Sequence, residues 1–71
     1  RILIAHDPEE IPITLPAEID LILHGHTHRH RLEERDGALI FNPGECAGML
    51  AGRNAVGVVD LLSLRAGLLR F

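Results

Sequence analysis

Apolar residues occur along this chain in short runs that are separated by polar stretches and turn residues. Residues 2–5 and 21–23 are unbroken apolar runs, a pattern typical of strands that are covered on both faces. The first run ends shortly before Pro8, which disfavours helical angles at Asp7, and the second ends near Gly25, which permits a sharp bend. We therefore predict two buried strands, each of which closes into a loop at its carboxyl end.

The stretch between these two strands does not have the pattern of a helix. Pro12 and Pro16 interrupt residues 9–19 and rule out a long regular helix there. One turn near residues 16–19 is the most that we expect. The stretch is also shorter than the usual crossover between two parallel strands.

A β-hairpin is predicted in the middle of the chain. Residues 29–35 are polar apart from Leu32, as in an edge strand, and residues 38–41 are apolar. Between them, Asp36-Gly37 is a strong signal for a two-residue hairpin turn. Asn42-Pro43-Gly44 then predicts a second sharp turn.

The last third of the chain predicts a loop followed by two strands. Glycines recur at four-residue spacing through residues 45–54, which favours a flexible loop. Residues 56–59 predict a strand, and residues 67–71 predict a last strand antiparallel to it, while residues 61–66 are also compatible with one helical turn. We expect the buried runs to form one sheet.

Composition limits what these elements can do. The 71 residues are 46% hydrophobic but only 3% aromatic, so the core is aliphatic. Folding of so short a chain hides only about 60% of its surface, which makes stability marginal without a metal or a partner. The formal net charge is −3 and no basic stripe is interleaved with aromatics, so we expect no nucleic-acid binding. No apolar run is long enough to cross a bilayer, and we expect no membrane contact.

Two further expectations follow from the single cysteine and from the first residues of the chain. Cys46 excludes an internal disulfide and fits a reducing compartment, so we expect a cytoplasmic protein. Without an evident base beside it, Cys46 is interpreted as a small buried hydrophobe rather than a reactive thiol. Because residues 2–5 already form a core strand, we expect the chain to be a piece of something longer.

Histidines gather where the two buried strands end. His26 and His28 follow the bend at Gly25, and His6 follows the first strand. Neutral imidazole is the commonest metal-ligating side chain, and open α/β sheets place ligands at the carboxyl ends of their strands. We therefore predict that His6, His26 and His28 converge at one edge of the sheet as metal ligands. The competing interpretation is a solvated histidine-rich loop with a hydrogen-bonded histidine at a strand end.

Three nearby polar residues are weaker candidates. His24 is a possible outer contact of the site or a group on the substrate side, and His30 is expected on the surface. Asn42 and the amides of its turn could face the histidines, although a plain turn would use the same residues.

The segments LILHGHTHR, IFNPGECAG and AVGVVDL together resemble the C-terminal half of a calcineurin-like metallophosphoesterase. The nearest group is the small bacterial and archaeal phosphodiesterases in which GHTH is followed by NPGE or NPGS. The resemblance covers nearly all of residues 1–71, which would then be one partial domain without its N-terminal half. It implies an α/β fold, of which this piece is an α+β fragment: the mostly β half of a β-sandwich flanked by helices, with few helices of its own.

The resemblance also implies a set of metal ligands. By position, His6, His26 and His28 match three histidine ligands of a binuclear centre, and His26 and His28 thereby become catalytic residues. In the family an Asp-X-His pair, an Asp and an Asn from the N-terminal half complete the set. Many members have His-Gly-His where this chain has His6-Asp7-Pro8, so the second histidine of that motif is absent.

The implied function is hydrolysis of a phosphodiester or phosphomonoester by a hydroxide that two divalent ions activate. Mixed histidine, carboxylate and amide ligation suits manganese best, with iron, nickel or zinc as alternatives. The implied partners are a small phosphate-ester substrate and the missing N-terminal half, without which we expect the chain to be inactive. Two alternatives stay open: a non-catalytic scaffold like the retromer subunit of this fold, which binds partner proteins, and a free-standing histidine-rich metal-binding module.

Overall fold

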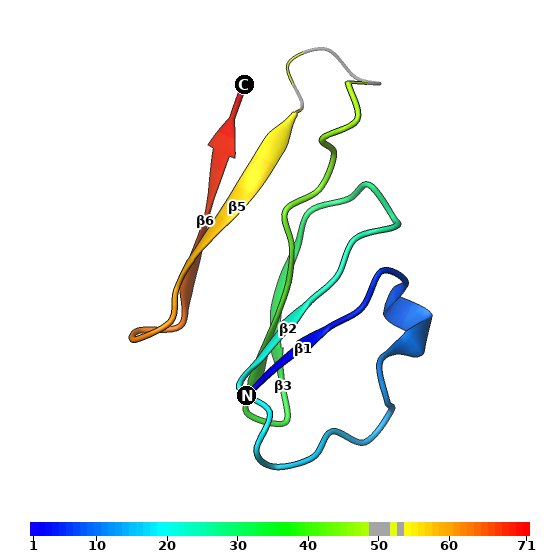
Figure 1. Cartoon of the computed structure of the whole chain (residues 1–71), viewed down its shortest axis with the longest axis vertical. Helices are drawn as coiled ribbons and strands as arrows, with labels where there is room; N and C mark the ends of the chain where they lie inside the picture. The colour runs from blue at the N-terminus through cyan, green and yellow to red at the C-terminus, as the bar shows by residue number, and fades with distance from the viewer. Residues whose placement is uncertain (49–51, 53) are drawn as a thin grey trace.

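The computed structural model describes residues 1–48, 52 and 54–71, and almost all of its regular elements are β-strands (Figure 1). In chain order the elements are β1 (Ile2–Ile4), the 3-10 turn η1 (Pro8–Glu10), β2 (Leu21–Leu23), β3 (Arg31–Arg35), β4 (Ala38–Asn42), β5 (Ala55–Asp60) and β6 (Arg65–Arg70). Within the described residues no helix is long and apolar enough to cross a membrane. Four strands form one sheet in the order β1-β2-β4-β3, and β5 and β6 form a second.

The predicted strands and the predicted hairpin are confirmed. β1, β2 and β4 run parallel, with Leu3 opposite Ile22 and Ile22 opposite Ile40. β3 pairs antiparallel with β4 through the Asp36-Gly37 turn, in which φ is 52° and 82°. Positive φ at both central residues gives a turn whose twist matches that of the flanking strands. The connection from β1 to β2 contains only η1 as regular structure, because its prolines prevent a longer helix.

The prediction of one continuous sheet was wrong. β5 and β6 pair only with each other, in register from Ala55 opposite Arg70 to Asp60 opposite Arg65. β6 also begins before residue 67, so residues 61–64 form a hairpin turn instead of a helical one. Leu64 closes this turn with a φ of 54°, a left-handed conformation that an α-helix does not contain.

One face of the four-stranded sheet carries the hydrophobic core. Ile22 and Ile40 are fully buried there, and Ile11 and Leu15 of the β1–β2 connection cover them. This connection therefore contributes to folding through two apolar side chains and not through helical structure.

The β5–β6 hairpin packs on the opposite face of the four-stranded sheet. Gly57 of β5 lies directly against Phe41 and Pro43, close enough that a Cβ at Gly57 would overlap the Phe41 ring. Phe41 points away from the Ile40 face, since neighbouring residues of a strand point to opposite sides. The hairpin is thus a second layer over part of the sheet.

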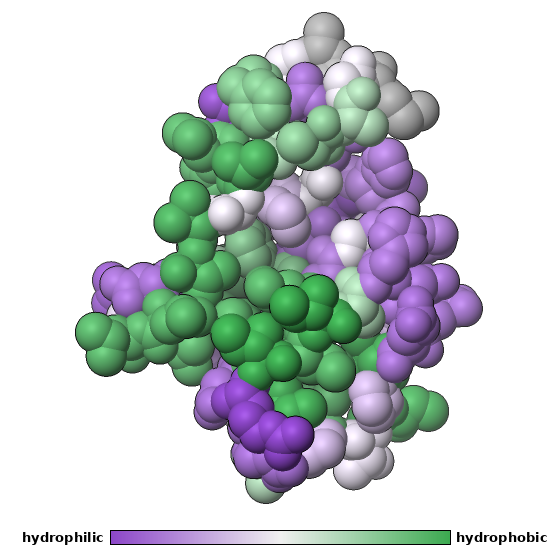
Figure 2. Space-filling view, viewed as in Figure 1, coloured by the Kyte–Doolittle hydropathy of each residue, from purple (hydrophilic) through white to green (hydrophobic). Residues whose placement is uncertain are grey.

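The cover over β1 is incomplete, which corrects the prediction that this strand is buried on both faces. Ile2 is 47% and Ile4 75% exposed, whereas Leu3 between them packs against the core. Figure 2 shows hydrophobic surface over the β5–β6 hairpin and over the neighbouring strands of the sheet. The exposed apolar side chains include Val58, Leu62 and Leu69. A large apolar surface of this kind is typical of a face that another part of a protein covers.

Two expectations concern the segment before β5. The predicted loop over residues 45–54 falls partly outside the described residues, at 49–51 and 53. Cys46 is exposed, so its interpretation as a buried hydrophobe was wrong. The neighbouring Glu45 takes the buried position instead, because its carboxylate finds hydrogen-bond donors there.

Candidate metal centre

The parallel pairing of β1 and β2 continues past both strands and brings two loops together. The amide of Ala5 donates to the carbonyl of Leu23 over 3.0 Å, and the amide of Gly25 donates to the carbonyl of His6 over 3.1 Å. The chain after each strand is thus fixed beside the other at the carboxyl edge of the sheet. This ladder places His6 next to the loop that carries His26.

The imidazoles of His6 and His26 meet edge to face at this edge. Nε2 of His6 lies 3.1 Å from Nδ1 of His26, and the ring planes cross at 78°. Two nitrogens that each bind one ion at about 2.1 Å lie roughly 3.0–3.4 Å apart. The spacing therefore suits two ligands of a single ion, and both rings are exposed.

The loop that carries His26 and His28 has an unusual backbone. His26 has a φ of 71° and His28 a φ of 58°, both in the left-handed region. This conformation costs free energy for residues other than glycine and is concentrated at functional sites. Two such residues in three positions give the loop a sharp bend directly after β2.

His28 pairs with a carboxylate from another segment. Its Nδ1 donates to Oε1 of Glu45 over 3.1 Å, and Glu45 is only 6% exposed. Hydrogen bonds from the backbone amide of Ala47 and then from His28 lower the pKa of the Glu45 carboxyl, which keeps it ionised. A carboxylate only accepts hydrogen bonds, so Nδ1 of His28 is the donor, and in the neutral ring this leaves the lone pair of Nε2 free.

Asn42 connects the histidine loop to the turn that precedes Glu45. Its side-chain nitrogen donates to the carbonyl of Gly25 and to Oγ1 of Thr27, and its oxygen accepts from the amide of Gly44. Asn42 is 1% exposed, so it lies behind the loop and does not face solvent.

His24 and His30 lie apart from His6 and His26. His24 is buried, with Nδ1 3.1 Å from the carbonyl of Gly25 and Nε2 3.2 Å from Nη1 of Arg31. Because the carbonyl only accepts and the guanidinium only donates, both ring nitrogens are used. His30 is exposed, as expected, and its ring meets Phe41 edge-on.

Asp7 directly follows His6 and precedes the turn η1. It caps η1 by accepting from the amide of Glu9, and Glu10 reaches back to the amide of Asp7. Its other oxygen lies 3.9 Å from Nε2 of His26. The ring of His26 therefore has His6 on its Nδ1 side and a carboxylate on its Nε2 side.

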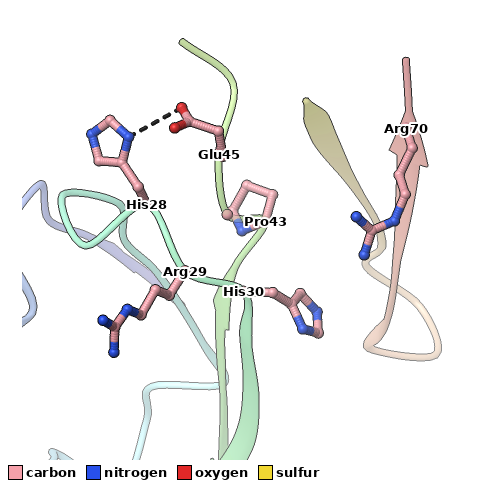
Figure 3. A pocket seen from close by; sticks show the side chains of 7 residues that line it. His28, Arg29, His30, Pro43, Glu45 and Arg70 are labelled. Carbon is pink, nitrogen blue, oxygen red and sulfur yellow. Dashed lines mark hydrogen bonds and ion pairs between the residues drawn. The ribbon is translucent and has the colours of Figure 1, made fainter. Parts of the chain in front are cut away.

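A cavity of about 360 Å³ opens beside His28 (Figure 3). Its lining comprises His28, Arg29, His30, Pro43, Gly44, Glu45 and Arg70. His30 and Arg70 point into the space between the sheet and β6, and His28 turns toward Glu45. The two guanidiniums, of Arg29 and Arg70, outnumber the single carboxylate of Glu45, so these three groups carry a net charge of +1.

The structure brings together only part of the predicted ligand set. Among the described residues, no three His, Cys, Asp or Glu side chains are arranged to hold one metal ion. His6 and His26 meet, whereas His28 is directed to Glu45, so the predicted convergence of all three histidines is not found. The donors nevertheless suit divalent ions, since the pair has ligand spacing and His28 keeps a free nitrogen.

Sequence analysis gave no role to Glu45, Asp7 or Arg70. For Asp7 a signal was present, because Asp7-Pro8-Glu9-Glu10 has the spacing of a capping box with proline at the first position. For Glu45 and Arg70 no local pattern exists, since their neighbours come from segments distant in the chain.

Comparison with known proteins identifies a family for this chain. Residues 2–63 match the model of the calcineurin-like phosphoesterase superfamily domain. The chain is 46% identical over 41 residues to the phosphodiesterase MJ0936 of Methanocaldococcus jannaschii, a match that covers 58% of this chain and 25% of the relative. It also resembles the solved structure of a novel archaeal phosphodiesterase, with a TM-score of 0.63 and 36% identity over 73% of this chain and 32% of that one.

This chain belongs to the calcineurin-like phosphoesterase superfamily, whose domain model matches most of its length. The expected class, a mostly β piece of the α/β fold of that family, is confirmed by the structural match. The family generally uses divalent metal ions. The chain spans about a quarter of the curated relative's length and about a third of that of the solved structure.

Proposed function

We propose that this chain is part of a metal-dependent phosphoesterase and supplies three of its histidine ligands. The observation that carries the proposal is the 3.1 Å approach of His6 to His26 at the carboxyl edge of a parallel sheet. Membership of the superfamily and two relatives described as phosphodiesterases support phosphate-ester hydrolysis, and phosphodiesters above all.

The contacts favour two ions over one. His6 and His26 would hold one ion between Nε2 and Nδ1, while His28 would hold a second through Nε2, because its Nδ1 is bound to Glu45. The carboxylate and amide ligands of the family would come from outside this chain. When bound, the two ions would activate water and polarise the phosphoryl group for in-line attack. Manganese is the ion that we propose, with iron, nickel and zinc as alternatives.

The cavity beside His28 fits an anionic substrate. Arg29 and Arg70 bring positive charge to its wall, and guanidinium groups bind phosphate oxygens well. A phosphodiester seated there would lie next to the ion at His28. The side chains of this chain would then bind and orient the phosphodiester.

The test uses the complete protein that contains this chain, depleted of metal and then reloaded with manganese. Hydrolysis of bis(p-nitrophenyl) phosphate should depend on the metal and should be abolished by His26→Ala and by His28→Ala. Glu34→Gln is the control, since Glu34 is exposed on β3 and lies outside the cavity lining, and it should retain most activity. Near-normal turnover by the His28→Ala protein would refute the proposal.

A further inference from the structure

Glu45 is a buried carboxylate whose position is fixed from two directions. Its backbone carbonyl accepts from the amide of Ala55 in β5 over 2.8 Å, and its Oε1 accepts from the amide of Ala47 over 2.7 Å. The same oxygen accepts from Nδ1 of His28 over 3.1 Å. The carboxylate is therefore held independently of His28 and can act on the orientation of that ring.

The chemistry of imidazole gives this contact a consequence. A ring that donates from Nδ1 to a carboxylate exposes the lone pair of Nε2, and the negative charge makes that nitrogen a stronger ligand. Nε2 points away from the Nδ1 side of the ring, so a bound ion and Glu45 would lie on different sides of His28. Glu45 is thus placed to accept a hydrogen bond from a metal ligand, and not to bind the ion itself.

The other histidine of the loop shows the reverse arrangement. Nδ1 of His26 faces His6, and its Nε2 side faces Asp7. Two histidines that are two residues apart therefore present opposite ring nitrogens to an ion. In each ring the other nitrogen faces a carboxylate, that of Asp7 for His26 and that of Glu45 for His28. The use of different ring nitrogens by the two histidines suits ligands of two separate ions.

We propose that Glu45 is the positioning residue for His28: it selects the tautomer that presents Nε2 and holds the ring in the direction of its ion. The proposal rests on the proposed function, in which His28 is a metal ligand. It assigns the residue after Pro43-Gly44 a role in metal binding, and the sharp turn serves to bring that residue behind the histidine loop.

The experiment measures metal binding and the His28 tautomer in the complete protein. Manganese affinity is determined by titration of the metal-depleted protein, and the tautomer by ¹⁵N NMR of the imidazole. Glu45→Ala should weaken binding about 10- to 100-fold and should shift His28 away from the Nδ1-protonated form. Glu45→Gln keeps an acceptor without the charge, so it should retain the tautomer and lose less affinity. Glu34→Gln on β3, an exposed glutamate, is the matched control and should change neither.

A double-mutant cycle separates positioning from general support of the turn. If Glu45 acts through His28, adding Glu45→Ala to His28→Ala should cause little further loss of affinity. Equal losses in both backgrounds, or an unchanged tautomer in Glu45→Ala, would overturn the inference. If His28→Ala itself binds manganese normally, the proposed function fails first, whereas normal binding by Glu45→Ala alone removes only this inference.

Discussion

The side-chain nitrogen of Asn42 lies 3.2 Å from the carbonyl oxygen of Gly25, at the point where the histidine loop leaves β2. The same nitrogen reaches Thr27, and the side-chain oxygen accepts from Gly44. One buried amide thus uses both of its donors and its acceptor to join the loop of His26 to the turn that precedes Glu45.

Replacement of Asn42 by alanine should lower both stability and metal affinity. It removes the hydrogen bonds to Gly25, Thr27 and Gly44, which should cost about 1–3 kcal/mol in the free energy of unfolding. The loop would also lose its fixed position relative to Glu45. Urea unfolding and manganese titration of the complete protein measure the two effects. Asn54→Ala is the control, because the side chain of Asn54 accepts an exposed hydrogen bond from the amide of Gly48, and an Asn42→Ala protein as stable as this control would contradict the prediction.

Replacement of His26 by asparagine should make the metal-free protein more stable but weaken its metal binding. Its φ of 71° is strained for histidine but is tolerated by asparagine and glycine. His26→Asn should therefore raise the free energy of unfolding of the metal-free protein by about 0.5–1 kcal/mol, while it removes a ligand. Urea unfolding without and with manganese tests both parts. His30→Asn should give no such gain, since His30 is not left-handed, and a destabilised His26→Asn protein would show that the strain is absent.

The contact between the two sheets predicts opposite effects for two glycines of one hairpin. A Cβ at Gly57 would lie 2.8 Å from Cζ of Phe41 and 3.2 Å from Cβ of Pro43, so Gly57→Ala should destabilise by about 1–3 kcal/mol. Gly67 in β6 has open space around it, and Gly67→Ala should be neutral or slightly stabilising. Urea unfolding of both variants measures the two free energies of unfolding. Equal values would mean that the β5–β6 hairpin does not pack against Phe41.

Arg70 should contribute to substrate binding more than to the chemical step. Its guanidinium lines the cavity beside His28, so Arg70→Gln should raise the KM for a phosphodiester several-fold with a smaller change in kcat. Rising salt should reduce the difference between the variant and the parent, because the attraction is electrostatic. Arg65→Gln, at the opposite end of β6, should leave KM unchanged. An unaltered KM in Arg70→Gln would mean that the cavity does not hold the substrate.

Local patterns predicted the parts of this structure that depend on local chemistry. The apolar runs gave β1 and β2, Asp36-Gly37 gave the hairpin, and the shared carboxyl edge of parallel strands accounts for the approach of His6 to His26. In each case the chain itself, through strand pairing or turn geometry, dictates the result.

The partners of individual side chains could not be predicted in this way. His28 and Glu45 are 17 residues apart, and their contact depends on how the turn at Pro43-Gly44 aims the following chain. The exposure of Ile4 and of Cys46 likewise depends on what covers them, which no pattern within residues 1–71 records. The sequence-based predictions therefore failed for contacts between residues that are distant in the chain and for side chains whose exposure depends on how other segments pack.

The last prediction is that this chain alone does not hydrolyse phosphate esters. His6 and His26 can hold one ion, but His28 is apart from them and the described residues offer no carboxylate that bridges two ions. Without a bridge, the charges of two ions at short range repel each other and the second position stays empty. The exposed face of β1 and the hairpin should also make the isolated chain prone to association. A phosphodiester assay with manganese, on the purified chain and after it is mixed with the rest of the protein, tests this directly. We expect turnover only in the mixture; metal-dependent turnover by the chain alone, removed by His26→Ala, would show that three imidazoles suffice.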